Sequence, residues 1–168
     1  MRRLLLIVLA MATTVAWVAG CDQQRAAELQ PGVSTEADVR REFGGPTLIY
    51  EKLDGSKQLE YPRQPEGVTN YLAVIGADGK LSALTQQLTP DNFAQVQPGM
   101  AQEAVRRLLG KPAKTQRFDL KPNEEHWLWR FEETGGHKRL FTATFGPDKL
   151  VTATTIGEDS SDTQIGGR

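Results

Sequence analysis

The feature that most constrains this chain is an internal repeat. The segment Leu-Gln-Pro-Gly-Val at residues 29–33 returns as Val-Gln-Pro-Gly-Met at residues 96–100. Residues 39–46 return as residues 105–112, with five identities in eight positions. The matches keep their order, and their offset drifts only between 66 and 70 residues, which is expected when loops alone change length. The pattern therefore predicts a tandem duplication.

Each copy is expected to open with a short helix that has a clear end. Gly44 and Gly110 stand where a left-handed C-cap residue belongs. Pro46 and Pro112 follow two residues later and forbid continuation of the helix. A helix-ending role explains these glycines and prolines without a functional loop.

The starts of these helices also carry signals. In the first copy Ser34 or Thr35 can cap the helix, and Asp38 completes the spacing of a capping box with Thr35. Between the copies, Thr89 and Pro90 provide a cap and a first-turn proline. We therefore expect a short helix before the second Gln-Pro-Gly segment.

After each proline the apolar period changes from helix to strand. Trp127, Trp129 and Phe131 alternate with polar or smaller residues, so the three aromatic rings share one face. Leu59 and Tyr61 are their counterparts in the first copy. Rings that share one strand face are more typical of a core than of an interface, although exposed rings would suit a contact surface.

The fold class predicted from these patterns is α+β, with each repeat a short helical segment followed by about three antiparallel strands. Units of about sixty residues are marginal alone, so the two repeats are expected to pack together or share one sheet. The expected division is a cleaved signal peptide (1–20), a lipidated cysteine and tether (21–28), repeat 1 (29–89), repeat 2 with its leading helix (90–157) and a disordered tail (158–168).

The N-terminus has the layout of a secretory leader, with Arg2 and Arg3 followed by an apolar run too short for a typical membrane-spanning helix. The tetrad Val18, Ala19, Gly20 and Cys21 resembles the lipobox of bacterial lipoproteins. The resemblance implies cleavage after Gly20, a diacylglycerol on the Cys21 sulfur and an acyl chain on the new α-amino group. An uncleaved signal anchor, or an ordinary signal peptide with an incidental cysteine, are the alternatives.

Composition excludes several other classes. The chain has 20 basic and 21 acidic residues, a balance that argues against nucleic-acid binding. One cysteine cannot form an internal disulfide, and two histidines beside it cannot make a Cys/His zinc cage. We expect no cofactor beyond the covalent lipid, and no metal site.

Together these motifs resemble the SmpA/OmlA (BamE-like) family of outer-membrane assembly lipoproteins. The resemblance covers about residues 29–157, and the second copy matches best, since the first has Leu59 and Tyr61 where tryptophans are expected. Family members typically have one copy of the domain. The residues that carry the resemblance are Gly32, Val39, Gly44, Pro46, Gly99, Val105, Gly110, Pro112, Trp127 and Trp129.

The resemblance implies a non-catalytic accessory module in β-barrel protein assembly or envelope maintenance. Its partners would be the membrane, through the lipid, and the assembly machinery or another envelope protein. The implied location is the outer membrane, facing the periplasm. The inner membrane is the alternative, because Asp22 follows the cysteine. A second hypothesis is an inhibitor or binding protein, since the beta-lactamase-inhibitory proteins also pair two related units.

Two residue clusters invite functional hypotheses. Glu124, Glu125, His126 and His137 could transfer protons, but no nucleophile elbow, phosphate loop or metal spacing accompanies them, so an enzyme is not expected. A basic cluster could face a partner or an anionic lipid headgroup, although a solvated helix face is the simpler interpretation. It consists of Arg106, Arg107, Lys111, Lys114 and Arg117, echoed by Arg40 and Arg41.

Overall fold

The computed structural model of the chain describes residues 21–159, which form two similar units. The first contains helices α2 (Cys21–Glu28) and α3 (Glu36–Phe43) and strands β1 (Leu48–Glu51), β2 (Lys57–Pro62), β3 (Asn70–Ile75) and β4 (Leu81–Gln86). The second contains helices α4 (Pro90–Gln95) and α5 (Gln102–Leu109) and strands β5 (Lys114–Phe118), β6 (Lys121–Glu132), β7 (Lys138–Phe145) and β8 (Val151–Glu158).

Each unit has its own antiparallel sheet, in the order β1-β2-β3-β4 (sheet 1) and β5-β6-β7-β8 (sheet 2). The α+β class and the two repeat-like units are confirmed, but each sheet has four strands instead of about three, and the repeats do not share a sheet. The strands that the sequence did not predict are β1 and β5. Both lie at a sheet edge and are largely exposed, so neither shows the alternation that marks a half-buried strand.

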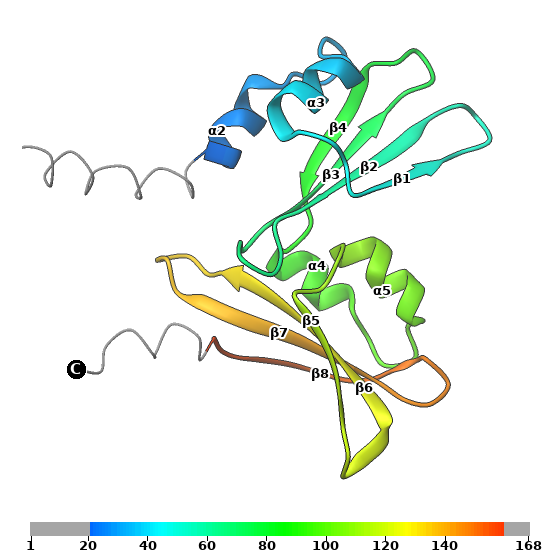
Figure 1. Cartoon of the computed structure of the whole chain (residues 1–168), viewed down its shortest axis with the longest axis vertical. Coiled ribbons are helices and arrows are strands. Elements are labelled where there is room, and N and C mark those ends of the chain that lie inside the picture. The colour runs from blue at the N-terminus through cyan, green and yellow to red at the C-terminus, as the bar shows by residue number, and fades with distance from the viewer. Residues whose placement is uncertain (1–20, 160–168) are drawn as a thin grey trace, which may run out of the picture.

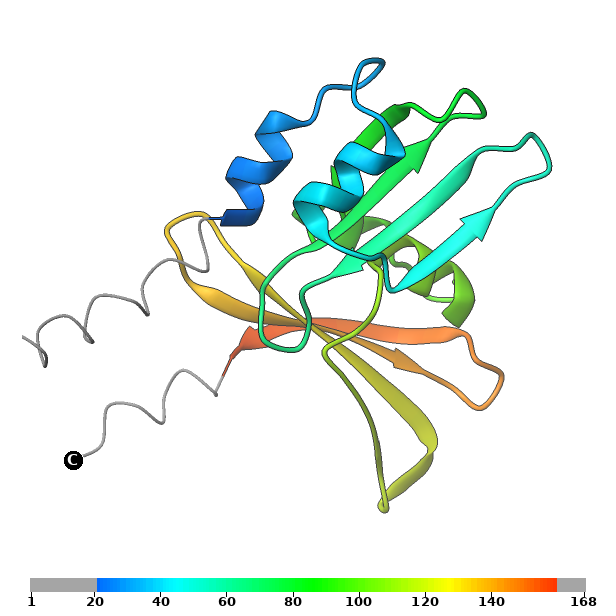
Figure 2. The same ribbon diagram turned by 45° about the horizontal axis from the view of Figure 1, so that its top comes forward.

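The elements stack in four layers (Figure 1). Helices α2 and α3 cover one face of sheet 1, helices α4 and α5 lie between the two sheets, and sheet 2 forms the far side. The turned view shows the same order (Figure 2). Helix α5 therefore packs its apolar side on sheet 2 and turns its other side to sheet 1.

Each repeat buries its own apolar core. In the first, Val39 and Phe43 of α3 pack on the β2 and β3 face that carries Leu59 and Tyr61. In the second, Val105 and Leu109 of α5 pack on sheet 2, together with Phe93 of α4. The core residues that sheet 2 contributes are Trp129, Phe131, Phe141, Ala143, Phe145 and Val151.

The two Gln-Pro-Gly segments make the same turn in each repeat. Gly32 and Gly99 have φ values of 78° and 88°, a region that L side chains rarely adopt. The Gly32 N–H donates to the Leu81 carbonyl, and the Gly99 N–H donates to the Val151 carbonyl, both at 2.8 Å. Each turn thus joins the start of the helix to the last strand of its own sheet.

The helix starts agree with the sequence signals. Thr35 is the N-cap of α3 and forms a capping box with Asp38. Thr89 is the N-cap of α4, with Pro90 in the first turn. The N-cap of helix α5 is Ala101, whose side chain makes no capping hydrogen bond.

The structure corrects one detail of the predicted helix ends, the backbone conformation of the C-cap glycines. Gly44 and Gly110 have positive φ, as predicted, but ψ values of −162° and −168° place them outside the left-handed helical region. This extended conformation with positive φ is open almost only to glycine. It turns the chain sharply from the helix toward the first strand of the sheet.

Both predicted flexible segments are partly ordered. Residues 21–28, predicted as a tether, form helix α2, whose Asp22 carboxylate accepts a hydrogen bond from Arg63 Nη2 at 3.2 Å. Strand β8 extends to Glu158, and Asp159 is buried and paired with Arg130. Residues 158 and 159, predicted as the start of a disordered tail, are therefore ordered. The predicted signal peptide and residues 160–168 lie outside the described residues.

Candidate functional site

The most elaborate polar arrangement in the structure is the joint between the repeats. Arg106 of α5 forms a bidentate ion pair with Glu60 on the face of sheet 1 that points away from α3. Glu60 is 2% exposed. Burial alone would lower the pKa of Arg106, but hydrogen bonding and charge from Glu60 raise it. Arg106 therefore keeps its positive charge inside the interface.

Side chains of the first repeat also cap the C-terminal end of α5. Asn70 Nδ2 donates to the carbonyl oxygens of Leu109 (2.8 Å) and Lys111 (3.0 Å). Gln87 Nε2 donates to the carbonyl oxygens of Arg107 and Leu108, at 2.9 and 3.1 Å. These bonds satisfy carbonyls that the helix itself leaves unpaired.

Gly110 lies at the closest point of this joint. A Cβ atom on it would stand 2.7 Å from Gln87 Oε1 and 2.9 Å from Asn70 Nδ2. The equivalent Gly44 has open space at that position. From the other side, Trp129 Nε1 donates to the Gly110 carbonyl at 3.0 Å, so Gly110 is held between the repeats.

A second contact joins the two units near the end of β2. The Gln64 side chain bonds the Arg130 backbone in both directions, with Nε2 donating to the carbonyl at 2.7 Å and Oε1 accepting from the N–H at 3.2 Å. Arg130 Nη1 donates to the Pro65 carbonyl at 3.0 Å. The repeats therefore meet through hydrogen-bonded polar groups, which fix their relative orientation.

The predicted basic cluster is divided by the fold. Arg106 is turned into the joint, as described above. Arg107 pairs with Glu103 on the surface and lies 5.6 Å from the centre of the Tyr50 ring. Arg117 pairs with Glu125. Lys111 and Lys114 are exposed. Arg106 is therefore withdrawn from the predicted patch, and a partner-facing or lipid-facing role of the exposed members stays a prediction.

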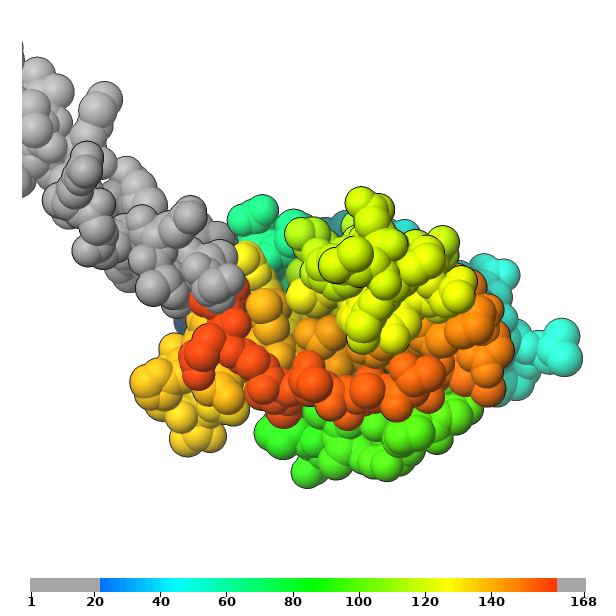
Figure 3. Space-filling view, turned by 90° about the horizontal axis from the view of Figure 1, so that it is seen from below, coloured from blue at the N-terminus to red at the C-terminus, as the bar shows by residue number. Residues whose placement is uncertain are grey.

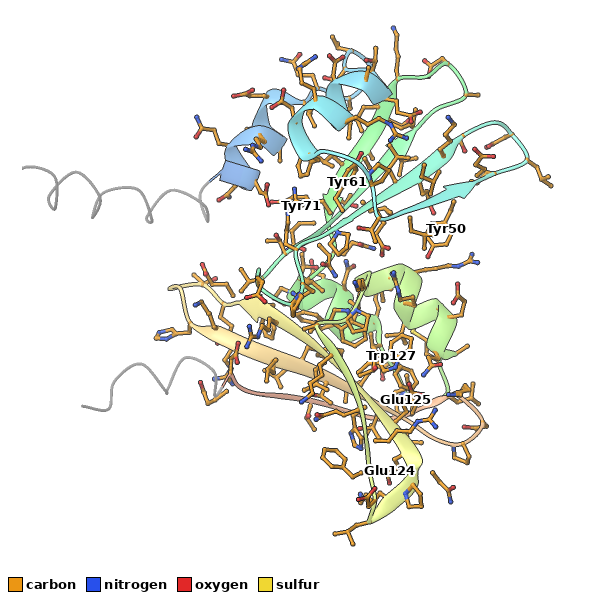
Figure 4. The ribbon with its side chains drawn as sticks, viewed as in Figure 1. Tyr50, Tyr61, Tyr71, Glu124, Glu125 and Trp127 are labelled. Atoms are coloured by element: carbon orange, nitrogen blue, oxygen red, sulfur yellow. The ribbon has the colours of Figure 1, made fainter. Side chains whose placement is uncertain are left out.

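The aromatic strand face is core. Trp129 and Phe131 are fully or almost fully buried, and Trp127 packs against the same cluster. Tyr61 and Tyr71 have the same role in the first repeat (Figure 4). The rings considered as a contact surface are therefore taken up by packing.

The acidic residues considered for proton transfer are engaged in ion pairs. Glu125 accepts hydrogen bonds from Lys149 Nζ (2.7 Å) and Trp127 Nε1 (3.1 Å), which, in that order, lower the pKa of Glu125 to about 2. Glu124 bonds Lys121 and lies 3.5 Å from His126. Glu124 and Glu125 lie along β6, beyond Trp127 (Figure 4).

His137 is not brought to this cluster. The register pairs His126 with Thr144, whereas Glu132 and Lys138 close the other end of the same hairpin, next to His137. Within residues 21–159 there is no group of three or more His, Cys, Asp or Glu side chains able to hold a metal ion. The candidate proton-transfer residues thus do not converge on one point.

A cavity lies beside helix α2. Its volume is about 640 Å³, and its walls come from α2, the β2–β3 loop and the end of β6. Arg63 and Asp22, which line it, are bonded to each other. Glu66 and Glu132 add negative charge.

The predicted lipidation residue opens α2, and the remaining lipobox residues, Val18, Ala19 and Gly20, lie outside the described part of the chain. None of the helices within residues 21–159 has the length and apolar character needed to cross a bilayer.

Fold and surfaces together define a class: a two-repeat α+β protein in which two helix-on-sheet units are joined by a buried polar interface. Residues 86–155 match the model of the outer membrane protein assembly factor BamE domain. The resemblance to the SmpA/OmlA (BamE-like) family is thus confirmed for the second repeat. Residues 29–85 of the first repeat lie outside the match, so its membership of the family stays a prediction.

Other comparisons add little. Among curated proteins, none matches this sequence. The chain is similar to the crystal structure of a DUF4309 family protein (YjgB) from Bacillus subtilis subsp. subtilis str. 168, at 17% identity and a TM-score of 0.33, covering 81% of this chain and 86% of that one. A likeness at that TM-score carries no argument about function.

Three residues of the joint, Glu60, Asn70 and Gln87, were not predicted as important from the sequence. A comparison of the copies contains the signal. By strand register, Glu60 and Asn70 are equivalent to Leu128 and Leu140, so the copies differ in polarity at these two positions.

Proposed function

We propose that this protein is a lipoprotein, anchored to the membrane by a lipid on Cys21. We propose that it acts as a non-catalytic accessory module in the assembly of outer-membrane β-barrel proteins. The observation that carries the proposal is the BamE domain match at residues 86–155. The fold agrees with such a role, because the polar groups of the joint hold two domains in one orientation without forming a reaction centre.

The proposed location is the outer membrane, with the protein facing the periplasm. Helix α2 starts at Cys21 and is docked by the bond between Asp22 and Arg63. Lipid on Cys21 would therefore hold the first repeat close to the bilayer instead of at the end of a loose tether. Anchoring raises the effective concentration of a module beside a membrane-embedded partner.

Lipidation is tested by labelling cells with radioactive palmitate. We expect the wild-type protein to be labelled and Cys21→Ser to be unlabelled. Label that survives Cys21→Ser would contradict the anchor. Fractionation of the two membranes then decides between the outer membrane and the inner membrane that Asp22 suggests.

The assembly role is tested by crosslinking in intact membranes, followed by identification of the co-purified proteins. Recovery of β-barrel assembly components supports the proposal. Recovery of a single soluble periplasmic enzyme instead would favour the inhibitor hypothesis and contradict the assembly role.

A further inference from the structure

Strand β8 forms one edge of sheet 2 and is exposed along almost its whole length. It pairs with β7 on one side, and no described strand lies on its other side. Residues 152–158 are all exposed, although their side chains alternate between the two faces of the sheet. The strand is open to view when the molecule is seen from below (Figure 3). Its outer edge is therefore accessible.

The outer edge of β8 is paired only at its first residue. The Val151 N–H donates to the Met100 carbonyl at 2.9 Å, and the Val151 carbonyl accepts from the Gly99 N–H at 2.8 Å. Within residues 21–159, residues 152–158 make no backbone–backbone hydrogen bond outside the ladder with β7. Every second residue of an edge strand turns its N–H and C=O away from the sheet, so these groups lack a backbone partner here.

The sequence of β8 lacks the features that usually keep a sheet edge from pairing. Natural edge strands are short, carry charge or proline, contain a bulge, or are covered by another element. Residues 151–157 include no charged residue and no proline, and five of these seven residues are valine, threonine or isoleucine. The one register shift against β7 lies before Ala153, so the ladder is regular from there to Glu158. The stretch is suited to accept another strand.

The other three sheet edges are each protected in one of these ways. Strand β1 has four residues, including Glu51, and β5 includes two basic residues. Strand β4 is uncharged, but four of its six residues are buried or half-buried. Its Leu84 packs against the core of the first repeat, as does Ala26 of α2. By strand register the equivalent of Leu84 is Thr154, which is exposed. The second repeat therefore leaves open an edge that the first one covers.

We propose that β8 binds an extended segment of another protein, which adds to sheet 2 as a further strand. The occupant is an extended chain because its backbone alone matches the alternating N–H and C=O groups of an edge. Ile156 pairs with the core residue Phe141 and shares its face, whereas Thr155 pairs with Thr142 on the opposite face. The bound segment therefore alternates, with apolar side chains beside Ile156 and polar ones beside Thr155.

This inference rests on the proposed role in assembly, and it names the occupant as a strand of a β-barrel protein that has not yet folded. The strands of outer-membrane barrels alternate apolar and polar residues with the same period of two. Before the barrel closes, the edges of such strands have no partner. Because backbone groups make most of the contact, the edge accepts strands of different sequence, as an assembly factor with many clients requires.

Binding is tested with residues 21–168 carrying Cys21→Ser and a short fluorescent peptide that alternates valine and threonine between terminal lysines. The control peptide has the same side chains but methyl groups on its backbone nitrogens, so it cannot donate to a strand edge. We expect the first peptide to bind and the methylated one to bind about tenfold more weakly or less, measured by fluorescence anisotropy. Equal binding of the two peptides, or binding of neither, would overturn the proposal.

The binding edge is located with Ile156→Lys, which gives β8 the kind of charge that protects natural edges. We expect this variant to bind the peptide about tenfold more weakly than the unsubstituted chain. Leu53→Lys is the matched control, since it replaces another exposed apolar residue, in the β1–β2 turn, and should leave binding unchanged. Circular dichroism checks that both variants are folded. Equal losses in the two variants would contradict binding at β8.

Two other occupants of the edge give different results. If residues 160–168 pair with β8, the peptide binds only after those residues are removed. If a second copy of the chain pairs with β8, the Cys21→Ser chain sediments as a dimer and Ile156→Lys converts it to a monomer. Either result would rule out a client strand as the occupant.

The native occupant is tested in cells with a photocrosslinking amino acid at Thr155, and at Leu53 as the matched control. We expect the Thr155 position to crosslink newly synthesised β-barrel proteins in a pulse label, and these products to decline during the chase. Absence of such products, or equal yields from both positions, would contradict the client strand. If deletion of the chain still lowers β-barrel protein levels in that case, the proposed function stands and only the surface is wrong.

Discussion

Gly110 is the residue at which backbone conformation and the joint between the repeats depend on each other. Its φ of 74° requires glycine, and the side chains of Gln87 and Asn70 leave no room for a methyl group. Gly44 has the same backbone conformation with open space around it. Alanine substitutions at the two glycines therefore distinguish the free-energy cost of the backbone conformation from the cost of the steric contact at the joint.

We predict that Gly44→Ala lowers the free energy of unfolding by about 1–2 kcal/mol, the cost of the backbone conformation alone. Gly110→Ala should cost about 1–3 kcal/mol more, because the hydrogen bonds of Asn70 and Gln87 must also shift. Urea denaturation of both variants measures the difference. Equal losses would show that the joint is more compliant than the contact distances indicate.

Glu60 carries the buried charge of the joint. Glu60→Gln leaves the Arg106 guanidinium without its counterion, and we predict a loss of about 3 kcal/mol in the free energy of unfolding. Glu103→Gln is the matched control, since its pair with Arg107 is exposed on both sides and should contribute less than about 1 kcal/mol. Comparable losses in the two variants would contradict a desolvated pair at Glu60.

Glu125 gives the structure a defined dependence on pH. Its folded-state pKa of about 2 lies below the ordinary value of 4.5. The stabilisation from its charge is thus complete above pH 4.5 and is lost as the pH falls toward 2. Glu125→Gln should therefore lower the Tm at pH 7 and have little effect near pH 2. A Tm difference that is constant over this range would rule out the charge as its cause.

At the scale of elements, the helices that pack on the sheets were predictable and the elements at the edges were not. In the sequence, α3 has a capping threonine and a terminal glycine, α4 a capping threonine and a first-turn proline, and α5 a terminal glycine. Strands β2, β3, β6 and β7 alternate because one face is core. Strands β1 and β5 are exposed on both faces. Helix α2 is too polar to show an apolar stripe, and its docking through Asp22 and Arg63 joins residues 41 positions apart.

The joint between the repeats could not be predicted either, because its residues lie far apart in the sequence. Glu60 and Arg106 lie 46 positions apart in the sequence. The Asn70 side chain donates to backbone carbonyls of residues that lie 39 and 41 positions after it. No local period marks a polar side chain that is buried by a distant element. The predicted basic cluster illustrates the consequence: Arg106 and Arg107 are neighbours in sequence, but one is buried in the joint and the other is on the surface.

The two principal helices differ in how they begin. Thr35 caps α3 with a full capping box, while Ala101 gives α5 no side-chain cap. We predict that Thr35→Ala lowers the free energy of unfolding by about 1 kcal/mol and that Ala101→Ser raises it by up to about 1 kcal/mol. Thermal denaturation checks both. Destabilisation by Ala101→Ser would mean that the first turn of α5 cannot accept the cap geometry.

For the whole molecule, stacking explains how two marginal units become one stable body. Helix α5 serves both repeats, since its apolar side completes the core of the second and its polar side is capped by the first. The stack leaves helix α2 at the proposed site of lipid attachment, Cys21. These are the features expected of an anchored module that binds a partner.

The central claim, an anchored assembly role, is tested most directly by measuring the levels of outer-membrane β-barrel proteins in a strain from which this chain has been deleted. We predict reduced levels that wild-type protein restores and Cys21→Ser does not, with the variant present at wild-type abundance. Unchanged β-barrel protein levels after deletion, or full restoration by Cys21→Ser, would contradict the account.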